Sequence, residues 1–172
     1  YWNIFDPNNG YTAIHGTILG LLPLDKINNG YFFETDMLFR LNTIRAVVLD
    51  IPQRAIYGGE KSHLKIVKEA PLFALHHLRI FSKRIFYNYY LRDFQFASIE
   101  WLLGPILLAF SLLFGLSKWS EAIASQEPAT AGTVMLAALP FLVGLQMVLS
   151  ALHFDIDMQP RTPVHSLIRK SD

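Results

Sequence analysis

The pattern of apolar and polar positions divides the chain near residue 63. Before this point, short apolar runs alternate with clusters of Pro, Gly, Asn and Asp, which is typical of short strands and helices joined by tight turns. The β-branched run at 45–51 (RAVVLDI) predicts a buried strand, and the apolar start at 1–6 (YWNIFD) predicts another. Residues 15–24 show a short helix pattern that ends at Pro23. After residue 63 the pattern becomes helical.

The stretch 31–42 (YFFETDMLFRLN) places two carboxylates, Glu34 and Asp36, inside an otherwise aromatic and aliphatic run. Residues 31–33 are expected to form a short strand, and residues 34–41 to open a helix. An unpaired charge is costly to bury, so these carboxylates need water, a partner or a catalytic role. Acidic residues in the first turn of a helix also face its positive end. Charge placement alone leaves helix capping and catalysis nearly balanced.

Residues 64–96 combine apolar and aromatic positions at helical spacing with Lys and Arg side chains. Such a segment ahead of a hydrophobic span is typical of amphipathic helices at a membrane surface. Its cations would face anionic lipid headgroups. The neighbouring His76 and His77 would point about 100° apart on a helix, so they predict surface or core histidines and not a metal site.

Two long apolar runs follow, at 97–116 and 129–152. The first carries one charge, Glu100, and the second carries none. At about 1.5 Å per residue, each is long enough to cross roughly 30 Å of hydrocarbon. Ser111 and Gly115 supply a small-xxx-small spacing that favours close helix contact. A buried hairpin in a soluble protein is the alternative.

Composition supports the membrane interpretation, because 52% of the residues are hydrophobic and the mean hydropathy is +0.28. The net charge of +1 gives no global attraction to nucleic acid. The absence of cysteine excludes disulfides and thiolate chemistry. Basic residues flank the two spans on one side, at 79–92 and 161–170, which predicts a multi-pass protein of the cytoplasmic membrane with its soluble part and C-terminus in the cytoplasm.

Two loops carry further candidate chemistry. The turn Asp6-Pro7-Asn8-Asn9-Gly10 is explained by turn propensity alone, since Asp and Asn side chains bond nearby backbone. The segment 52–62 (PQRAIYGGEKS) surrounds a glycine pair with Arg54, Lys61 and Ser62, which together would suit a phosphate. An ordinary loop with solvated charges explains the same residues.

Three of these stretches and the membrane segment occur in an order that resembles a known family. FDPNNGYTAI resembles an Asp-Pro-x-Ser-Gly-Phe loop, GYFFETDMLFRL resembles Gly-Tyr-x-Phe-x-x-Glu-Met-Leu, and IPQRAIYGGEKSHL resembles a loop ending Arg-x-x-Gly-x-Ser-Lys. Asp36 stands where that pattern has Glu, and Lys61-Ser62 is reversed. The chain is similar to the C-terminal half of membrane-anchored family 2 glycosyltransferases, the group of dolichol-phosphate mannose synthase and bacterial polyprenyl-phosphate glycosyltransferases.

The resemblance implies an α/β fold, the C-terminal part of a GT-A nucleotide-sugar transferase domain, followed by an amphipathic segment and a transmembrane hairpin. It also implies that the donor-binding half, with the ligands of a Mg²⁺ or Mn²⁺ ion, lies upstream of Tyr1, where the chain would begin in mid-domain. The expected organisation is an acceptor-side domain at 1–63, amphipathic juxtamembrane helices at 64–96, a transmembrane helix at 97–116, an extracytoplasmic loop at 117–128, a transmembrane helix at 129–152 and a cytoplasmic tail at 153–172.

The resemblance implies partners and roles as well: a nucleotide-sugar donor, a lipid-phosphate acceptor and membrane lipids, with no nucleic acid. Asp6 and Asn9 would line the donor-sugar side, and Glu34 and Asp36 would lie near the reacting centre. Arg54, Lys61 and Ser62 would hold the acceptor phosphate. A phosphate oxygen is already ionised near neutral pH, so positioning would dominate, whereas a hydroxyl acceptor would need Asp36 or Asp6 as a base. The fragment alone is expected to be inactive.

Two other interpretations stay open. A non-catalytic membrane adaptor would use a small cytoplasmic domain on a helical hairpin to recruit partners. A polysaccharide-extruding synthase would need more spans than two for a pore. The sequence fixes neither the sugar nor the acceptor, and two spans per subunit allow packing with further copies in a homo-oligomer.

Overall fold

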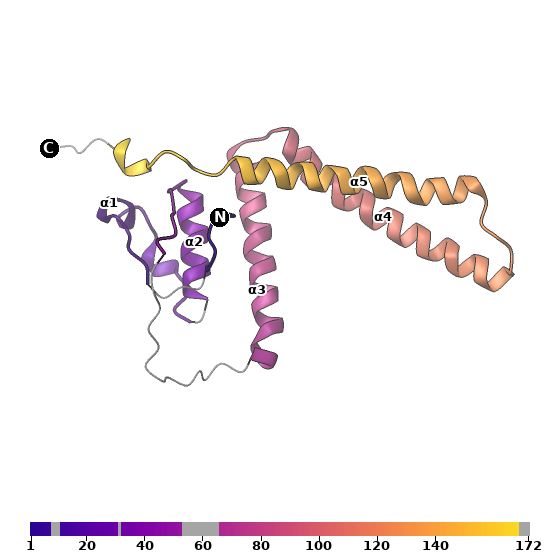
Figure 1. Cartoon of the computed structure of the whole chain (residues 1–172), viewed down its shortest axis with the longest axis horizontal. Helices are drawn as coiled ribbons and strands as arrows, with labels where there is room; N and C mark the ends of the chain where they lie inside the picture. The colour runs from indigo at the N-terminus through magenta and orange to yellow at the C-terminus, as the bar shows by residue number, and fades with distance from the viewer. Residues whose placement is uncertain (8–10, 31, 53–65, 169–172) are drawn as a thin grey trace. The chain divides into compact units, whose positions relative to one another are not determined.

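The computed structural model describes residues 1–7, 11–30, 32–52 and 66–168 (Figure 1). The chain divides into two compact units. The first consists of Tyr1–Asn88 with Gln159–Asp172, and the second consists of Tyr89–Met158. Each unit is described on its own.

The first unit is built from short helices around a small apolar core. Its elements are α1 (Gly16–Leu19), the 3-10 helix η1 (Leu24–Lys26), α2 (Phe33–Thr43), α3 (Ile66–Phe86) and the 3-10 helix η3 (Val164–Ser166). The core contains one residue of α1, two of α2 and two of the connecting segments: Ile18, Met37, Leu41, Leu22 and Ala46. Met37 and Leu41 lie one turn apart on α2, which explains why this helix turns that face inward.

The helix α2 ends in a closed turn. Arg45 adopts a left-handed conformation with φ 56°. Its backbone N–H donates to the carbonyl of Asn42 over 3.0 Å, and the N–H of Ala46 donates to the carbonyl of Leu41 over 2.9 Å. This pair of bonds is a Schellman motif formed without glycine. It directs the chain away from α2 and places Ala46 in the core.

The chain after the second unit returns to the first unit through η3. The rings of His15 and His165 stack with centroids 4.3 Å apart and an interplanar angle of 17°. His15 caps α1, because its Nδ1 accepts a hydrogen bond of 3.3 Å from the N–H of Thr17. Val164 packs against the core. Residues at the two ends of the sequence therefore complete one unit.

The expected α/β fold is wrong, because the elements in the described ranges are all helical and none is a strand. The two segments expected as strands, 1–6 and 45–51, run parallel, and the second is extended only after Arg45. The Tyr1 hydroxyl donates to the carbonyl of Ala46, and Asn3 Nδ2 donates to the carbonyl of Val48 over 3.2 Å. Two residues further on, the N–H of Phe5 donates to Asp50 Oδ2 over 2.6 Å.

Side chains, and not a backbone ladder, hold these extended segments together. Among the described residues, no backbone hydrogen bond joins one segment to the other. The expected burial holds only for the first part of the second segment: Ala46 is in the core and Val48 packs against it, whereas Leu49 and Ile51 are 72% and 76% exposed. β-propensity reflects packing against neighbouring strands, so a β-branched run without such neighbours stays extended and forms no sheet. The GT-A fold expected from the resemblance is overturned by this finding.

In the first unit, α3 packs one side against the rest of the unit. Phe32, which precedes α2, contacts the rings of Phe73, His76 and His77, with centroids 5.9, 5.0 and 4.9 Å away. Further along, the Arg84 guanidinium lies 5.9 Å from the centroid of the Trp2 ring. The expected strand at 31–33 is wrong where the structure describes it, because Phe32 is the N-cap of α2 and Phe33 its first residue.

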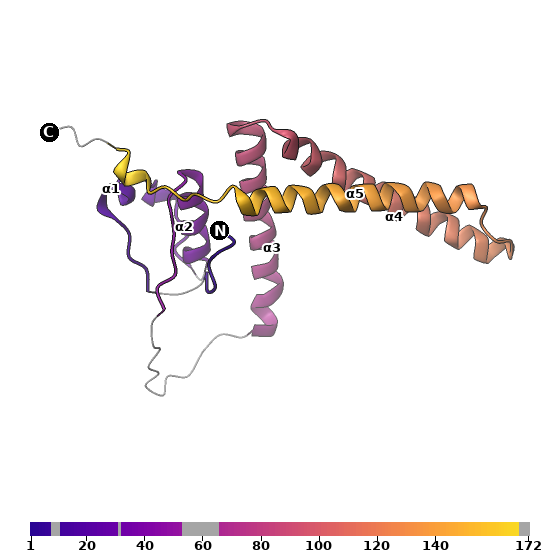
Figure 2. The ribbon, with the colours of Figure 1, turned by 45° about the horizontal axis from the view of Figure 1, so that its top comes forward.

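The second unit is an antiparallel helical hairpin, seen in Figures 1 and 2 as α4 and α5 side by side. The helix α4 spans Phe96–Ser125 and α5 spans Ala131–Asp157. Both are long and apolar enough to cross a membrane. The helix α4 continues to Ser125, so much of the expected loop at 117–128 is helical. The π-helix η2 (Tyr87–Arg92) leads into this unit.

Small residues allow α4 and α5 to approach closely. A Cβ atom added to Gly144 would lie 2.9 Å from the carbonyl oxygen of Gly104, and one added to Gly104 would lie 2.8 Å from Val148 Cγ2. The Ser111 hydroxyl donates to the carbonyl of Ala137. A Cβ atom at Gly115 would also meet Ala137, at 3.6 Å. The close contact expected from the Ser111 to Gly115 spacing is confirmed, and it lies inside the hairpin.

Candidate functional site

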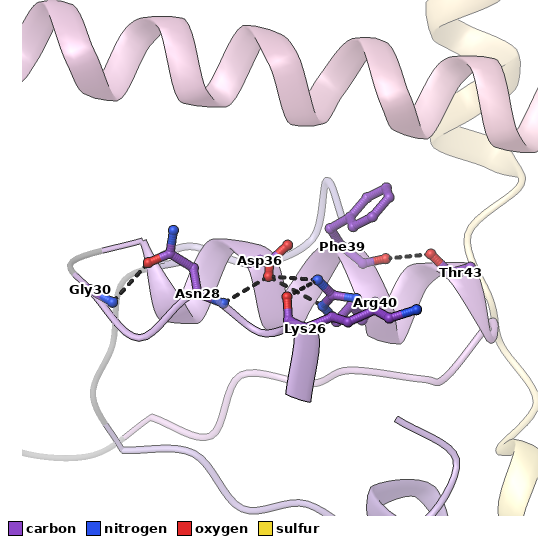
Figure 3. A network of polar contacts seen from close by, with 7 residues as sticks. All are labelled: Lys26, Asn28, Gly30, Asp36, Phe39, Arg40 and Thr43. Atoms are coloured by element: carbon purple, nitrogen blue, oxygen red, sulfur yellow. Dashed lines mark hydrogen bonds and ion pairs between the residues drawn. The ribbon is translucent and has the colours of Figure 1, made fainter. Parts of the chain in front are cut away.

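Asp36 lies at the centre of a polar network at the start of α2 (Figure 3). Its Oδ2 accepts hydrogen bonds from the backbone N–H of Asn28 over 3.0 Å and from Arg40 Nε and Nη2 over 3.2 and 3.0 Å. Arg40 also donates to the carbonyl of Lys26. Asn28 Oδ1 accepts from the N–H of Gly30 over 2.8 Å. One carboxylate oxygen therefore joins α2 to the turn that precedes it.

This arrangement gives Asp36 a structural role that the sequence did not reveal. The Asp36 and Arg40 side chains are 14% and 17% exposed, so the pair is largely shielded from water. An ion pair one helical turn apart stabilises a helix modestly, and the N–H of Asn28 adds a charge-assisted hydrogen bond to the same carboxylate. The bonds of Asp36 described above all end on Oδ2. Figure 3 shows Oδ1 on the side of the carboxylate away from Asn28 and Arg40, where a ligand would have to meet it.

Glu34 is the second carboxylate of α2. It lies in the first turn and is half-buried. Within the part of the chain that the structure describes, Glu34 has no hydrogen bond or ion pair, which contrasts with Asp36. Residues two apart on a helix do not face each other, so Glu34 and Asp36 share an end of α2 and not a face. Of the two, Glu34 is the carboxylate left available to a ligand.

Among the other predicted site residues, the structure describes only Asp6. Asp6 is exposed at the end of the first segment, next to Phe5, whose N–H is bonded to Asp50. Four of the predicted residues lie outside the described ranges: Asn9, Arg54, Lys61 and Ser62. Their proposed contacts with a sugar or a phosphate stay predictions.

Aromatic and histidine side chains hold the start of α2 against α3. Phe32 is 6% exposed and directly precedes the acidic first turn of α2. His77 Nδ1 lies 2.8 Å from the carbonyl oxygen of Phe73, so the ring is held on its own helix. His76 and His77 were interpreted as surface or core histidines, and their contacts with Phe32 agree with that interpretation. The Phe32 contact was missed because sequence spacing does not reveal which helices pack.

A second polar cluster, not anticipated from the sequence, lies in the second unit where the hairpin begins and ends. The Tyr89 hydroxyl donates to Asp155 Oδ1 over 2.9 Å, and Asp155 is 5% exposed. The Ser98 hydroxyl donates to the carbonyl of Tyr89 over 2.6 Å, and the Tyr90 hydroxyl donates to the carbonyl of Ser98 over 2.7 Å. These bonds fasten η2 to both helices of the hairpin.

Asp155 and Asp157 have the Asp-x-Asp spacing of a metal-binding motif, although the resemblance implies that this motif has no counterpart in the chain and lies upstream of Tyr1. Their side chains point in different directions because they are two apart on a helix. Asp155 is held by Tyr89, whereas Asp157 is exposed and lies 3.5 Å from His153. No three His, Asp or Glu side chains among the described residues are grouped to hold a metal ion. The Mg²⁺ or Mn²⁺ expected for a full-length enzyme stays a prediction from the resemblance.

Comparison with known proteins gives no match, whether with family models, curated proteins or solved structures. The resemblance to family 2 glycosyltransferases therefore rests on the residues of this chain alone.

Proposed function

We propose that this chain provides the lipid-acceptor side of a membrane-bound glycosyltransferase, which moves a sugar from a nucleotide-sugar donor to a polyprenyl phosphate at the cytoplasmic face. The observation that carries the proposal is the contact of Phe32 with Phe73, His76 and His77. This contact holds the acidic end of α2 against α3. Along the chain, α3 is separated from a membrane-spanning helix only by residues 87–95.

The order of elements supports an acceptor that is itself a lipid. Nine residues reach at most about 30 Å when fully extended. The length of this connection therefore limits how far the end of α3 can lie from the start of α4. A long prenyl chain in the bilayer would present its phosphate at the membrane boundary.

The two carboxylates of α2 take different roles in this proposal. Asp36 is a positioning residue, because its bonds to Arg40 and Asn28 fix the end of α2. Glu34 is the group that would contact substrate. With an ionised lipid phosphate as nucleophile, no proton has to be removed, and Glu34 would orient a sugar hydroxyl. With a hydroxyl acceptor, Glu34 would accept its proton.

Donor and metal binding are assigned to polypeptide other than the described residues. A leaving diphosphate requires electrostatic neutralisation, which a bound Mg²⁺ or Mn²⁺ would supply. Arg54, Lys61 and Ser62 keep the role given to them by the resemblance, as the residues that hold the acceptor phosphate.

The test measures acceptor binding by this chain in lipid nanodiscs, which requires no donor. Native mass spectrometry would compare undecaprenyl phosphate with phosphatidylglycerol, which also carries one phosphate. We expect selective retention of undecaprenyl phosphate, and loss of that selectivity in Arg54→Ala but not in the control Arg161→Ala. Equal retention of both lipids by the unaltered chain would refute the proposal. An adaptor without acceptor chemistry would give that result.

A further inference from the structure

The turn before α2 contains an asparagine that is followed by a glycine, Asn29-Gly30. Both residues are exposed, and within the described ranges the Asn29 side chain has no hydrogen bond. The side chain before it is bonded, because Asn28 Oδ1 accepts from the N–H of Gly30 over 2.8 Å (Figure 3). Of two adjacent asparagines, one therefore holds the Gly30 nitrogen, and the other has an unbonded side chain directly ahead of that nitrogen.

This arrangement bears on a reaction between a backbone nitrogen and the side chain that precedes it. The nitrogen of Gly30 can attack Cγ of Asn29, which closes a succinimide ring while the bond from Cγ to the side-chain nitrogen breaks. The proton that the Gly30 nitrogen loses to solvent is matched by the one that the departing nitrogen takes up to leave as ammonia. Water then opens the ring at either carbonyl, which gives aspartate or isoaspartate. Glycine favours the attack because it has no side chain to hinder its nitrogen.

The bond from Gly30 to Asn28 opposes this reaction. The attacking nitrogen must first lose its proton, and that proton is donated to Asn28 Oδ1. The turn is also held to α2, since the backbone N–H of Asn28 donates to Asp36 Oδ2 over 3.0 Å. A Cβ atom at Gly30 would lie 3.2 Å from Asn28 Oδ1, so glycine allows the close approach that this bond needs. The nitrogen becomes available to Asn29 when the turn opens locally.

We propose that Asn29 is a site of spontaneous deamidation and that the bond between Asn28 and Gly30 sets its rate. The reaction needs only water, so it requires no enzyme and does not depend on sugar transfer. Its product places a new carboxylate ahead of α2, at the end that already carries Glu34 and Asp36. In the isoaspartate form the backbone also gains a carbon atom, which lengthens the turn that is held to Asp36. Deamidation therefore alters the acidic end of α2 as the protein ages.

The extent of deamidation can be measured in the full chain. The chain in nanodiscs would be incubated at neutral pH for several weeks, and samples would be digested rapidly at mildly acidic pH. Cleavage after Lys26 and Arg40 releases residues 27–40 for mass spectrometry. The change in mass from amide to carboxylate gives the extent of reaction, and electron-transfer fragmentation distinguishes isoaspartate from aspartate. The same chain in urea gives the rate without the turn, and the pair Asn9-Gly10 serves as an internal reference.

Two substitutions at Asn28 separate the bond from the rest of the turn. Asn28→Ala removes the acceptor of the Gly30 N–H and should raise the rate at Asn29 by about twofold to tenfold, the range that corresponds to one hydrogen bond. Asn28→Asp is the matched control, since it keeps an acceptor at the same place and should react like the unaltered chain. The rate at Asn9 should be the same in all three chains. In urea the three chains should react at similar rates at Asn29, because the turn is lost.

Several results would overturn the proposal. If Asn29 reacted as fast in the folded chain as in urea, the turn would not restrain it. An Asn29 that reacted in urea but stayed equally slow in folded Asn28→Ala would exclude the bond to Gly30 as the restraint. Equal acceleration at Asn9 and Asn29 in that variant would assign the effect to a general loss of stability. A product with aspartate and no isoaspartate would indicate direct hydrolysis, without attack by the Gly30 nitrogen.

Discussion

Asp36 and Arg40 lie one turn apart on α2 and form an ion pair of 3.0 Å on the same oxygen that accepts the N–H of Asn28. Replacing Asp36 with Ala removes the acceptor for three hydrogen bonds and leaves a partly buried guanidinium without its carboxylate. We expect a loss of about 1–3 kcal/mol in the stability of the first unit. Hydrogen exchange of the amides from Asn28 to Gly30 would measure it.

Glu34→Ala is the matched control for that variant. Glu34 lies in the same first turn but has no described hydrogen bond. Its removal should change the exchange of the same amides by less than about 0.5 kcal/mol, as is usual for substitutions away from buried networks. If Asp36→Ala had no greater effect than Glu34→Ala, the structural role assigned to Asp36 would be wrong.

Stability of the first unit should fall at alkaline pH because of Tyr1. Burial raises the pKa of the Tyr1 phenol above its ordinary value of 10.0, since the phenolate would lose solvation. The unfolded chain ionises first as the pH rises. The contribution of the protonated Tyr1 phenol to the stability of the first unit is therefore complete below pH 10.0 and decreases as the pH rises toward the pKa of the folded state.

Tyr1→Phe should flatten this alkaline decline, which urea unfolding at several pH values would show. At neutral pH it should cost about 0.5–1.5 kcal/mol, because the hydroxyl no longer donates to the carbonyl of Ala46. Tyr11→Phe serves as the control, since Tyr11 is 89% exposed. An identical alkaline decline in all three chains would contradict the buried environment of Tyr1.

The two carboxylates at the end of α5 should respond differently to substitution. Asp155→Ala removes the acceptor of the buried Tyr89 hydroxyl, so we expect about 1–3 kcal/mol of destabilisation. Asp157→Ala loses only an exposed pair with His153, expected to contribute less than about 1 kcal/mol. Thermal unfolding in nanodiscs, followed by near-ultraviolet circular dichroism, would compare the two. Similar losses would show that the bond from Tyr89 contributes little.

Alanine substitutions at three glycines of the second unit would test how closely α4 and α5 pack. Gly144→Ala should destabilise the hairpin by about 1–3 kcal/mol, because the new methyl group meets the backbone carbonyl of Gly104. Gly104→Ala should cost a similar amount, since its methyl group would meet Val148 Cγ2 at 2.8 Å and the backbone carbonyl oxygen of Gly144 at 3.1 Å. At Gly132 the nearest atom is the Thr130 hydroxyl oxygen, at 3.9 Å, so Gly132→Ala should be neutral or slightly stabilising. Resistance to denaturation in mixed micelles would compare the three variants, and a loss for Gly132→Ala as large as for the other two would exclude this packing.

The sequence predicted helices much better than it predicted the fold. The apolar runs at 97–116 and 129–152 lie almost wholly within the longer helices α4 and α5, because length and uniform hydropathy are local properties. The Ser111 to Gly115 spacing indicated a close helix contact, and the structure shows that the partner is α5. The segments 1–6 and 45–51 were interpreted as strands from their β-branched and aromatic content. Strand formation depends on neighbours that a local pattern does not contain.

The candidate site, too, was predicted from the sequence only in part. The pattern identified Glu34 and Asp36 as unusual carboxylates, and their place in the first turn of a helix is confirmed. It did not separate their roles, because the partner of Asp36 that fixes the turn is the backbone N–H of Asn28. Any residue other than proline offers a backbone N–H, so the amino-acid sequence does not reveal which one donates to Asp36. The Tyr89 to Asp155 bond was missed because it joins residues 66 positions apart.

The stacking of His15 on His165 has a consequence for biosynthesis. A ribosome makes His15 first and His165 only after both helices of the hairpin have been made. Contacts between distant residues must wait for the later partner, whereas α4 and α5 are joined by a short connection and can pair soon after synthesis. Synthesis of the first unit therefore begins before that of the second unit and ends after it. Until then its nascent core lacks the contact with Val164.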